Sequence, residues 1–515
     1  MADLLIAGGG LGGCAAAAAA CAKGLSVVLT EETDWIGGQV TSQAVPLDEH
    51  KWIEKFGSTR RYREYREKVR QFYLRNLPLK EELLQSEKLN PGNALVSNLS
   101  HDPRVSVLVL NEMLSPYLIS GQLRIHYHTV VKHVNRTGKK VTSVVLQHIN
   151  GAETEIEAAY IIDATEAGDL LPLANIQYVT GSESRKETGE PHAGEESNLS
   201  NIQAFTYVLA MEYREGENHV IDEPEMYSFW KTFQPDFWPD KTLSYYAPHP
   251  ITHEKREYGL FKGEGSFPLW DYRRIYAADH FKSDFSGDVT LLNWPQNDYF
   301  LGNIYGVTEQ EKEKHLFQAK QLSLSLFYWL QTEAPRPDGN KGYPGLKLRG
   351  DVLGTEDGFA KAPYLREARR IKALYTITEQ DVSPDFNKGT GKKYADSVGI
   401  GSYSIDLHPS LSGENYIDIP ALPFHIPLGA LIPQELDNLL AGNKNIGTTH
   451  ITNGCYRLHP VEWNIGEACG ELAAYCVHKR VNPADVREDE NTLKEFQDLL
   501  KKSGFELEWP ADFYQ

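Results

Sequence analysis

A histidine and an aspartate near the C-terminal third of the chain form the first candidate for chemistry. His408 follows Asp406 by two residues, and on a strand that spacing places both side chains on one face. An imidazole titrates near neutrality, so His408 can accept a proton from a substrate O–H or N–H group. The alternative is a structural histidine held by hydrogen bonds. Tyr403, in the same segment, is a further catalytic candidate.

Three arginines form a basic cluster within an acidic chain: Arg366, Arg369 and Arg370. A guanidinium can grip a substrate carboxylate through two parallel hydrogen bonds. The alternative is a helix on which Arg366 and Arg370, four residues apart, pair with structural acids such as Glu367 or Asp381. We expect a structural role for two of these arginines and keep Arg366 as the candidate substrate ligand.

A glycine-rich turn near the N-terminus predicts dinucleotide binding. Gly8, Gly10 and Gly13 fit the pattern GxGxxG, in which the glycines permit a tight turn, close approach to a pyrophosphate and close helix packing. The amides of this turn, including those of Leu11 and Gly12, can hold phosphate without a basic side chain. Glu31 lies 18 residues after Gly13, where a carboxylate can accept both ribose hydroxyls of an ADP group.

The elements around this turn form a predicted βαβ unit. An apolar strand at 3–7 precedes the turn, an alanine-rich helix follows to about Lys23, and Gly24 separates it from a second strand at 25–30. Further helices are expected at 59–75, 102–120, 309–332, 461–478 and 492–503, and strands at 123–163 and 439–441. The run 159–162 is apolar throughout, as in a central parallel strand.

Two further segments favour FAD over NAD as the dinucleotide. Glu31 is followed by the paired glycines Gly37 and Gly38, and this stretch resembles one found in glutathione-reductase-type flavoproteins, where the glycines pass close to the cofactor. The segment 161–169 resembles the strand-then-ATG segment of the same proteins, with Glu166 in place of the usual glycine. The resemblance adds these cofactor-binding candidates: Glu32, Gly38, Gln39, Ser42, Ala164, Thr165 and Asp169.

Segments 364–382, 397–408, 438–450 and 457–470 are together similar to a family described as FAD-dependent oxidoreductases and sometimes mislabelled after xanthan lyase. The resemblance implies that the C-terminal segment closes the flavin site and that the helix beginning near Val461 points its N-terminus at the flavin. The implied cofactor-binding residues are Val131, Gly442, Asn443, His450, Arg457, Val461, Asn464 and Ile465. The sequence departs from the family at Asn443, where arginine is commoner, and at Glu462 and Trp463, where small residues are usual.

Composition excludes several classes of protein. The net charge of −19 over 515 residues disfavours nucleic acid and anionic membranes as partners. No apolar run reaches the roughly 20 residues that span a bilayer, and the N-terminus does not read as a signal peptide. The five cysteines form no CxxC pair, so buried free thiols are expected in place of disulfides, and no metal site is predicted. We therefore expect a protein of the cytoplasm.

The predicted fold class is α/β. We expect a discontinuous Rossmann-like FAD-binding domain at 1–185 and 396–485, with a parallel sheet and a β-meander. A mixed α+β substrate or cap domain is expected at 186–395, where aromatic residues and long irregular stretches accumulate, and a closing helix and tail at 486–515.

Three functions remain open at this stage. The first is an FAD-dependent oxidoreductase that transfers hydride between a small organic substrate and the flavin. The second is a flavin monooxygenase, and the third is a non-catalytic scaffold that keeps the fold. The sequence contains no second GxGxxG, so electrons would come from the substrate or from a separate reductase or acceptor.

Overall fold

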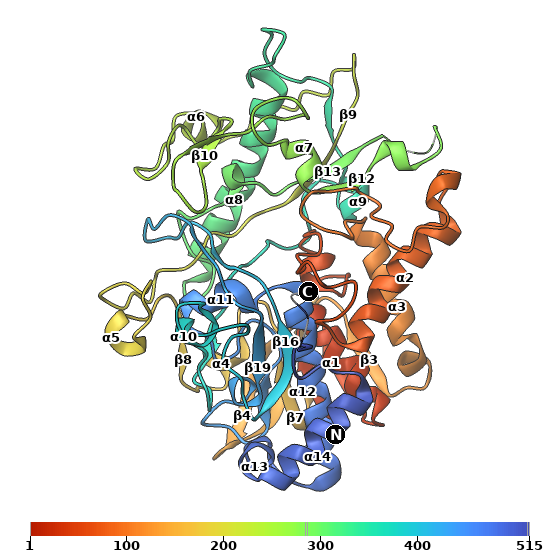
Figure 1. Cartoon of the computed structure of the whole chain (residues 1–515), viewed down its shortest axis with the longest axis vertical. Coiled ribbons are helices and arrows are strands. Elements are labelled where there is room, and N and C mark those ends of the chain that lie inside the picture. Colours follow the sequence, from red (N-terminus) through yellow and green to blue (C-terminus); the bar gives the residue numbers. More distant parts are fainter. Residues whose placement is uncertain (1, 284, 286, 512, 514–515) are drawn as a thin grey trace.

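A five-stranded parallel sheet lies at the centre of the lower half of the molecule (Figure 1). The computed structural model describes residues 2–283, 285, 287–511 and 513. The strand order is β20-β7-β1-β2-β3, and the strands are β1 Ala2–Ala7, β2 Val27–Thr30, β3 Leu123–His126, β7 Ala158–Asp163 and β20 Leu439–Ala441. β1 pairs with both β2 and β7, so the turn that follows β1 lies near the middle of the sheet edge.

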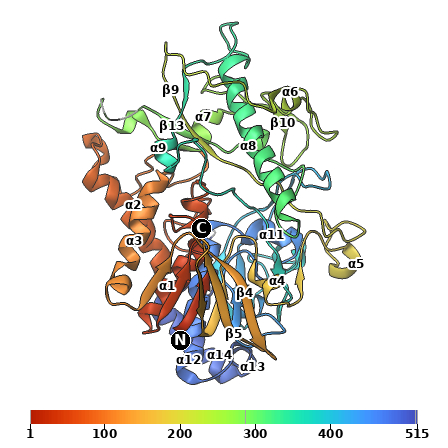
Figure 2. The same cartoon turned by 180° about the vertical axis from the view of Figure 1, so that it is seen from behind.

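Two helices from opposite ends of the chain cover this sheet together. α1 Leu11–Ala22 and α12 His459–Lys479 lie side by side in both views (Figures 1 and 2). Their contact is close because it is made by small residues: a Cβ on Gly466 would lie 2.0 Å from the Gly12 carbonyl oxygen, and one on Gly470 would lie 2.4 Å from that of Ala16. The alanine-rich sequence of α1 therefore serves helix packing.

Further elements surround the sheet. The antiparallel meander is β4 Thr129–Thr137, β5 Lys140–His148 and β6 Glu153–Ile156. Three two-stranded sheets pair β8 Tyr178–Val179 with β15 Arg370–Ile371, β16 Ser397–Gly401 with β19 Phe424–Pro427, and β17 Ile405–Leu407 with β18 Ile417–Ile419. The helices are α2 Arg60–Asn76, α3 Pro103–Ile119, α4 Leu170–Leu173, α5 Arg185–Thr188, α10 Glu379–Val382, α11 His450–Tyr456, α13 Pro483–Glu488 and α14 Glu490–Ser503.

The upper half has its own antiparallel sheet and a long helix, coloured green in Figure 1. The sheet order is β12-β13-β9-β14, with β9 Leu209–Tyr213, β12 Arg274–Tyr276, β13 Val289–Leu292 and β14 Leu346–Leu348. α8 Glu309–Thr332 begins with a capping box formed by Thr308 and Glu311. The smaller elements are α6 Tyr227–Trp230, β10 Tyr246–Pro248, β11 Lys255–Glu257, α7 Leu269–Tyr272 and α9 Gly350–Leu353.

The structure has two large hydrophobic cores. One contains the parallel sheet, α1 and α12 and extends into β9, β12 and β13 of the upper half, and the other is rich in aromatic residues from 202–365. The predicted α/β fold class, the βαβ unit and the buried free cysteines are confirmed. The suggested helix around Arg366–Arg370 is wrong, because residues 364–371, all of which the structure describes, are extended or irregular and end in β15.

Candidate functional site

The glycine turn between β1 and α1 is held against two neighbouring segments of chain. Gly8 has a φ of +97°, which favours glycine. A Cβ on Gly8 would lie 2.3 Å from the Ala164 carbonyl oxygen, one on Gly13 would lie 2.0 Å from that of Gly8, and one on Gly12 would lie 2.3 Å from that of Gly442. The glycines therefore permit three close backbone approaches, and Ala164 and Gly442 lie beside the turn as the sequence predicts.

Glu31 directly follows β2, and one of its carboxylate oxygens is bound by a neighbouring residue. Its Oε1 accepts hydrogen bonds from the Thr33 amide at 2.8 Å and the Thr33 hydroxyl at 2.7 Å. Burial raises the pKa of Glu31 to about 7. Its carbonyl oxygen accepts from the Thr129 amide at 2.9 Å, so the start of β4, which carries the half-buried Val131, is fixed beside this carboxylate. Glu32 is exposed at the surface.

The paired glycines place Gln39 and Ser42 close to the phosphate turn. Gly37 and Gly38 both have positive φ, 112° and 52°. A Cβ on Gly38 would lie 2.9 Å from the Gly10 Cα atom. The short helical turn Gly38–Val40 then buries Gln39, and the Ser42 hydroxyl donates to the Gly38 carbonyl at 3.3 Å. The GG segment thus contacts the first glycine turn directly.

A carboxylate from α12 accepts a hydrogen bond from an amide of the phosphate turn. Glu462 Oε1 accepts from the Gly12 amide at 2.9 Å, and its Oε2 accepts from the Gln39 side-chain amide. Burial, followed by the nearby Glu166 carboxylate, raises the pKa of Glu462 from 4.5 to about 7. Glu462, where the family usually has a small residue, therefore lies where a cofactor phosphate oxygen is expected.

An ion pair flanks the same turn. Lys444, almost fully buried, pairs with Glu166 Oε2, while Glu166 Oε1 would lie 2.9 Å from a Cβ on Gly10. Sequence reasoning missed Lys444. The available signal was its place directly after Asn443, where the family more commonly has an arginine, because a cation is then present one residue further along.

The residues after β7 and β20 fix the far side of the turn. Thr165 donates through its hydroxyl to Asp163 at 2.7 Å and accepts from the Asp169 amide at 2.7 Å. Burial raises the pKa of Asp163 to about 7. The Asn443 side-chain amide donates to the Ala164 carbonyl oxygen at 3.3 Å. These residues order the backbone next to the phosphate turn.

The N-terminal turns of α12 pack against β16. The Asn464 side-chain amide donates to the Val398 carbonyl oxygen at 3.1 Å. A Cβ on Gly401 would lie 2.6 Å from Val461 Cγ2, and Ile465 is fully buried in the core. Val461 and Asn464 therefore pack against β16, and the binding of a flavin by Val461, Asn464 and Ile465 stays a prediction.

A chain of alternating charges connects the two halves of the molecule. Arg366 Nη2 lies 2.9 Å from Asp298 Oδ1, and Asp298 Oδ2 lies 2.5 Å from His408 Nδ1. His408 Nε2 lies 3.7 Å from Asp406 Oδ2, which in turn lies 3.1 Å from Arg457 Nη2. Burial opposes the ionisation of Asp298, but Arg366 and His408 hold its pKa below the ordinary value. The structure thus brings Asp406 and His408 together.

The other predicted basic residues belong to a separate network. His450 Nδ1 lies 2.9 Å from Glu367 Oε1, and Arg370 pairs with Glu367 at 2.6 Å and Glu183 at 3.0 Å. Burial alone would lower the pKa of His450, but Glu367 raises it above the ordinary value. Arg369 pairs with Asp169 at 3.0 Å. Arg369 and Arg370 therefore form the structural ion pairs that were expected of two arginines in the cluster.

A second polar cluster lies at the N-terminus of α12, and sequence reasoning missed two of its members. The Asp48 amide donates to His459 Nδ1 at 3.0 Å. Arg273, from the upper half, lies 4.0 Å from Asp48 Oδ2. Tyr403 lies in the same cluster, where burial and the carboxylate of Asp48 raise its pKa. Nothing in the local sequence around Arg273 or Asp48 indicates this contact, because the two segments meet only in the folded protein.

The residues of the glycine turn fit FAD. The turn leaves no room for side chains at Gly8, Gly12 or Gly13, and the Gly12 amide already binds a carboxylate oxygen, which shows that it can bind an anion. Glu31, Gly442 and Lys444 would surround the ADP portion, and Gln39, Ser42 and the first turns of α12 would lie towards the flavin. A phosphate oxygen of FAD and the carboxylate of Glu462 would compete for the Gly12 amide.

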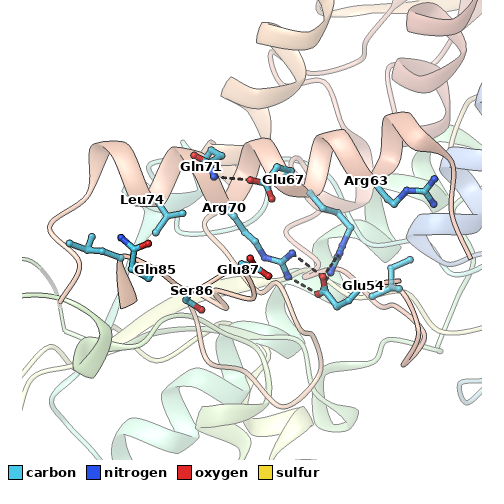
Figure 3. Close-up of a pocket in the computed structure, with 12 residues that line it drawn as sticks. Glu54, Arg63, Glu67, Arg70, Gln71, Leu74, Gln85, Ser86 and Glu87 are labelled. Carbon is cyan, nitrogen blue, oxygen red and sulfur yellow. Dashed lines mark hydrogen bonds and ion pairs between the residues drawn. The ribbon is translucent and has the colours of Figure 1, made fainter. Parts of the chain in front are cut away.

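A separate surface hollow of about 560 Å³ lies beside α2 (Figure 3). Arg70 points at Glu54 in this view, and their atoms approach to 2.6 Å. Arg66 pairs with Glu54 at 2.6 Å and with Glu49 at 2.9 Å. Arg63, which also lines the hollow, pairs with Glu506 at 2.6 Å. The described residues that line the hollow therefore offer no unpaired guanidinium group, and we place the functional site at the glycine turn.

The parallel sheet, the glycine turn and the acid at the end of β2 define a dinucleotide-binding flavoprotein. The family model for FAD dependent oxidoreductases matches residues 3–500. The chain therefore belongs to this family, and FAD is its cofactor. Within the described residues, no helix combines the length and the apolar character needed to cross a membrane.

Solved structures show more distant likenesses. THI4 of Thermovibrio ammonificans is 16% identical, with a TM-score of 0.24, 36% of this chain covered and 67% of that one. L-proline dehydrogenase from P. horikoshii is 16% identical, with a TM-score of 0.17 and coverages of 35% and 24%. The aromatic hydroxylase CabE from angucycline biosynthesis is 12% identical, with a TM-score of 0.25 and coverages of 43% and 40%. The chain thus spans less than half the length of the latter two. Among curated proteins, none matches the sequence.

Proposed function

We propose that this protein is an FAD-dependent oxidoreductase that transfers hydride between a small organic substrate and the flavin. The observation that carries the proposal is the position of His408 between two aspartates at the junction of the two halves. Residues 186–395 would form the substrate-binding cap. When bound, FAD supplies the acceptor or donor of the hydride.

The hydrogen bonds of His408 support a role as general base. Arg366 holds Asp298 in its ionised form, since the pKa of Asp298 is lowered, so the contact at 2.5 Å requires a proton on His408 Nδ1. In the neutral imidazole Nε2 then carries the lone pair. Asp406 lies 3.7 Å away, beyond hydrogen-bond distance, and would stabilise the charge once Nε2 has taken a substrate proton.

Anaerobic reduction of the bound flavin tests this proposal. A panel of small alcohols, amines and hydroxy acids is added to the purified protein without NADPH, and the visible absorbance of the flavin is followed. Bleaching by one substrate class supports substrate oxidation by the flavin. NADPH consumption coupled to oxygen uptake would instead support a monooxygenase, and a protein that remains colourless after incubation with FAD would support the scaffold alternative.

A further inference from the structure

The clearest unexplained group outside the glycine turn is the buried side chain of Arg273. This side chain is only 8% exposed. Its Nε and Nη1 atoms have no hydrogen-bond partner among the described residues, and its nearest carboxylate, Asp48, is 4.0 Å away. A buried guanidinium with unsatisfied donors is costly. Other buried arginines of this protein, such as Arg370, have carboxylates within about 3 Å.

A second arginine, Arg457, belongs to the same polar cluster. Arg457 donates to the Tyr364 hydroxyl at 2.6 Å and to Asp406, but its buried Nε also lacks a partner within the described chain. Arg273 and Arg457 both interact electrostatically with Asp48, Tyr364 and Tyr403. The two guanidinium groups, one from each half of the molecule, therefore line one polar cluster.

The other groups of this polar cluster also favour an anionic ligand. Burial, and then the charge of Arg273, lowers the pKa of His459 to about 3, so this imidazole is neutral. His459 begins α12, a helix of 21 residues whose N-terminal dipole attracts negative charge. Burial raises the pKa of Asp48, so the carboxyl group nearest to Arg273 among the described residues is less readily ionised. The unsatisfied arginine atoms are all donors, and a carboxylate supplies acceptors alone.

We infer that Arg273 and Arg457 bind the carboxylate of the substrate, so that the substrates of this enzyme are small organic acids. This inference rests on the proposed function. It changes the expected role of Arg366, whose charge is already neutralised by Asp298 at 2.9 Å. Arg457 connects this site to His408 through Asp406, so an acid held there would lie next to the proposed base.

Binding of benzoate, with benzamide as its uncharged counterpart, tests the inference on the protein as purified. Thermal melts and titration calorimetry should show saturable binding of benzoate, acetate or lactate and none of the corresponding amides. Arg273→Gln should weaken carboxylate binding roughly 10- to 100-fold, because charge-assisted hydrogen bonds are lost. Arg273→Lys keeps the charge but not the planar fork, so its affinity for the carboxylate should lie between those of the unaltered protein and Arg273→Gln.

Arg349→Gln is the matched control, because Arg349 is an arginine of the upper half that is fully paired, with Asp351 at 2.7 Å and Glu212 at 3.0 Å. It should bind benzoate like the unaltered protein. The inference would be overturned if Arg273→Gln and Arg273→Lys both bound benzoate as tightly as the unaltered protein does. It would also be overturned if the unaltered protein bound no acid more tightly than the corresponding amide. Flavin bleaching by a neutral substrate in Arg273→Gln would refute it and leave the proposed function intact. A protein that does not bind FAD but does bind benzoate would refute the proposed function and leave the carboxylate-binding site standing.

Discussion

Replacement of Glu462 by glutamine should strengthen FAD binding above neutral pH. The Glu462 carboxylate accepts a hydrogen bond from the Gly12 amide, the group expected to hold a phosphate oxygen. One N–H cannot serve both acceptors, and two anions at this distance repel each other. FAD binding therefore requires Glu462 to leave the amide or to be neutral. Glutamine removes the charge and retains the shape.

The size of the effect follows from the pKa of about 7. Below roughly pH 6 the carboxyl group is mostly neutral, and above roughly pH 8 it is mostly charged. If only the neutral form admits FAD, the apparent dissociation constant is divided by the neutral fraction. That fraction is about one half at pH 7 and about one hundredth at pH 9, so FAD affinity should fall about 50-fold between these values.

Titration of apoprotein with FAD, followed by flavin fluorescence between pH 6 and pH 9, measures this effect. The charged groups beside Glu462 are Glu166 and Lys444, and both remain in the Glu462→Gln variant. This variant should lose the roughly 50-fold fall in FAD affinity that Glu462 causes, and the pH dependence that remains reports Glu31, whose pKa burial also raises to about 7. Glu471→Gln is the control, since Glu471 is a buried acid on the same helix that pairs with Lys23 at 3.3 Å. The reasoning is refuted if Glu462→Gln keeps the full pH dependence or binds FAD more weakly at every pH.

Three further perturbations have defined outcomes. His408→Gln should lower kcat roughly 100- to 10,000-fold, the usual range for a general base, while flavin content is unchanged. Gly12→Ala should leave the purified protein with little flavin by absorbance, because the added Cβ would lie 2.3 Å from the Gly442 carbonyl oxygen. Arg370→Met should lower the free energy of unfolding in urea by about 3–5 kcal/mol, because Glu367, fully buried beside it, loses its closest ion pair; a loss below 1 kcal/mol would contradict this account.

The sequence by itself determined the βαβ unit and its glycine turn. Strand, turn, helix and second strand follow each other within 31 residues, and their signals are local: apolar runs, glycines that permit positive φ, and an acid at the end of the second strand. The cofactor follows from the same stretch with the GG segment. Asp406 and His408 were also paired from their spacing: β17 contains Asp406 and ends one residue before His408, and the two side chains lie 3.7 Å apart.

Only the tertiary structure decided which charges meet. The sequence makes Arg366 a candidate substrate ligand, and only the fold places Asp298, 68 residues earlier in the chain, beside it. Glu462 reaches the Gly12 amide across 450 residues, and Arg273 meets Asp48 across the junction of the two halves. Such contacts carry no local periodicity or spacing. They depend on how separate segments pack, and packing determines which buried charges are neutralised and which remain available for a ligand.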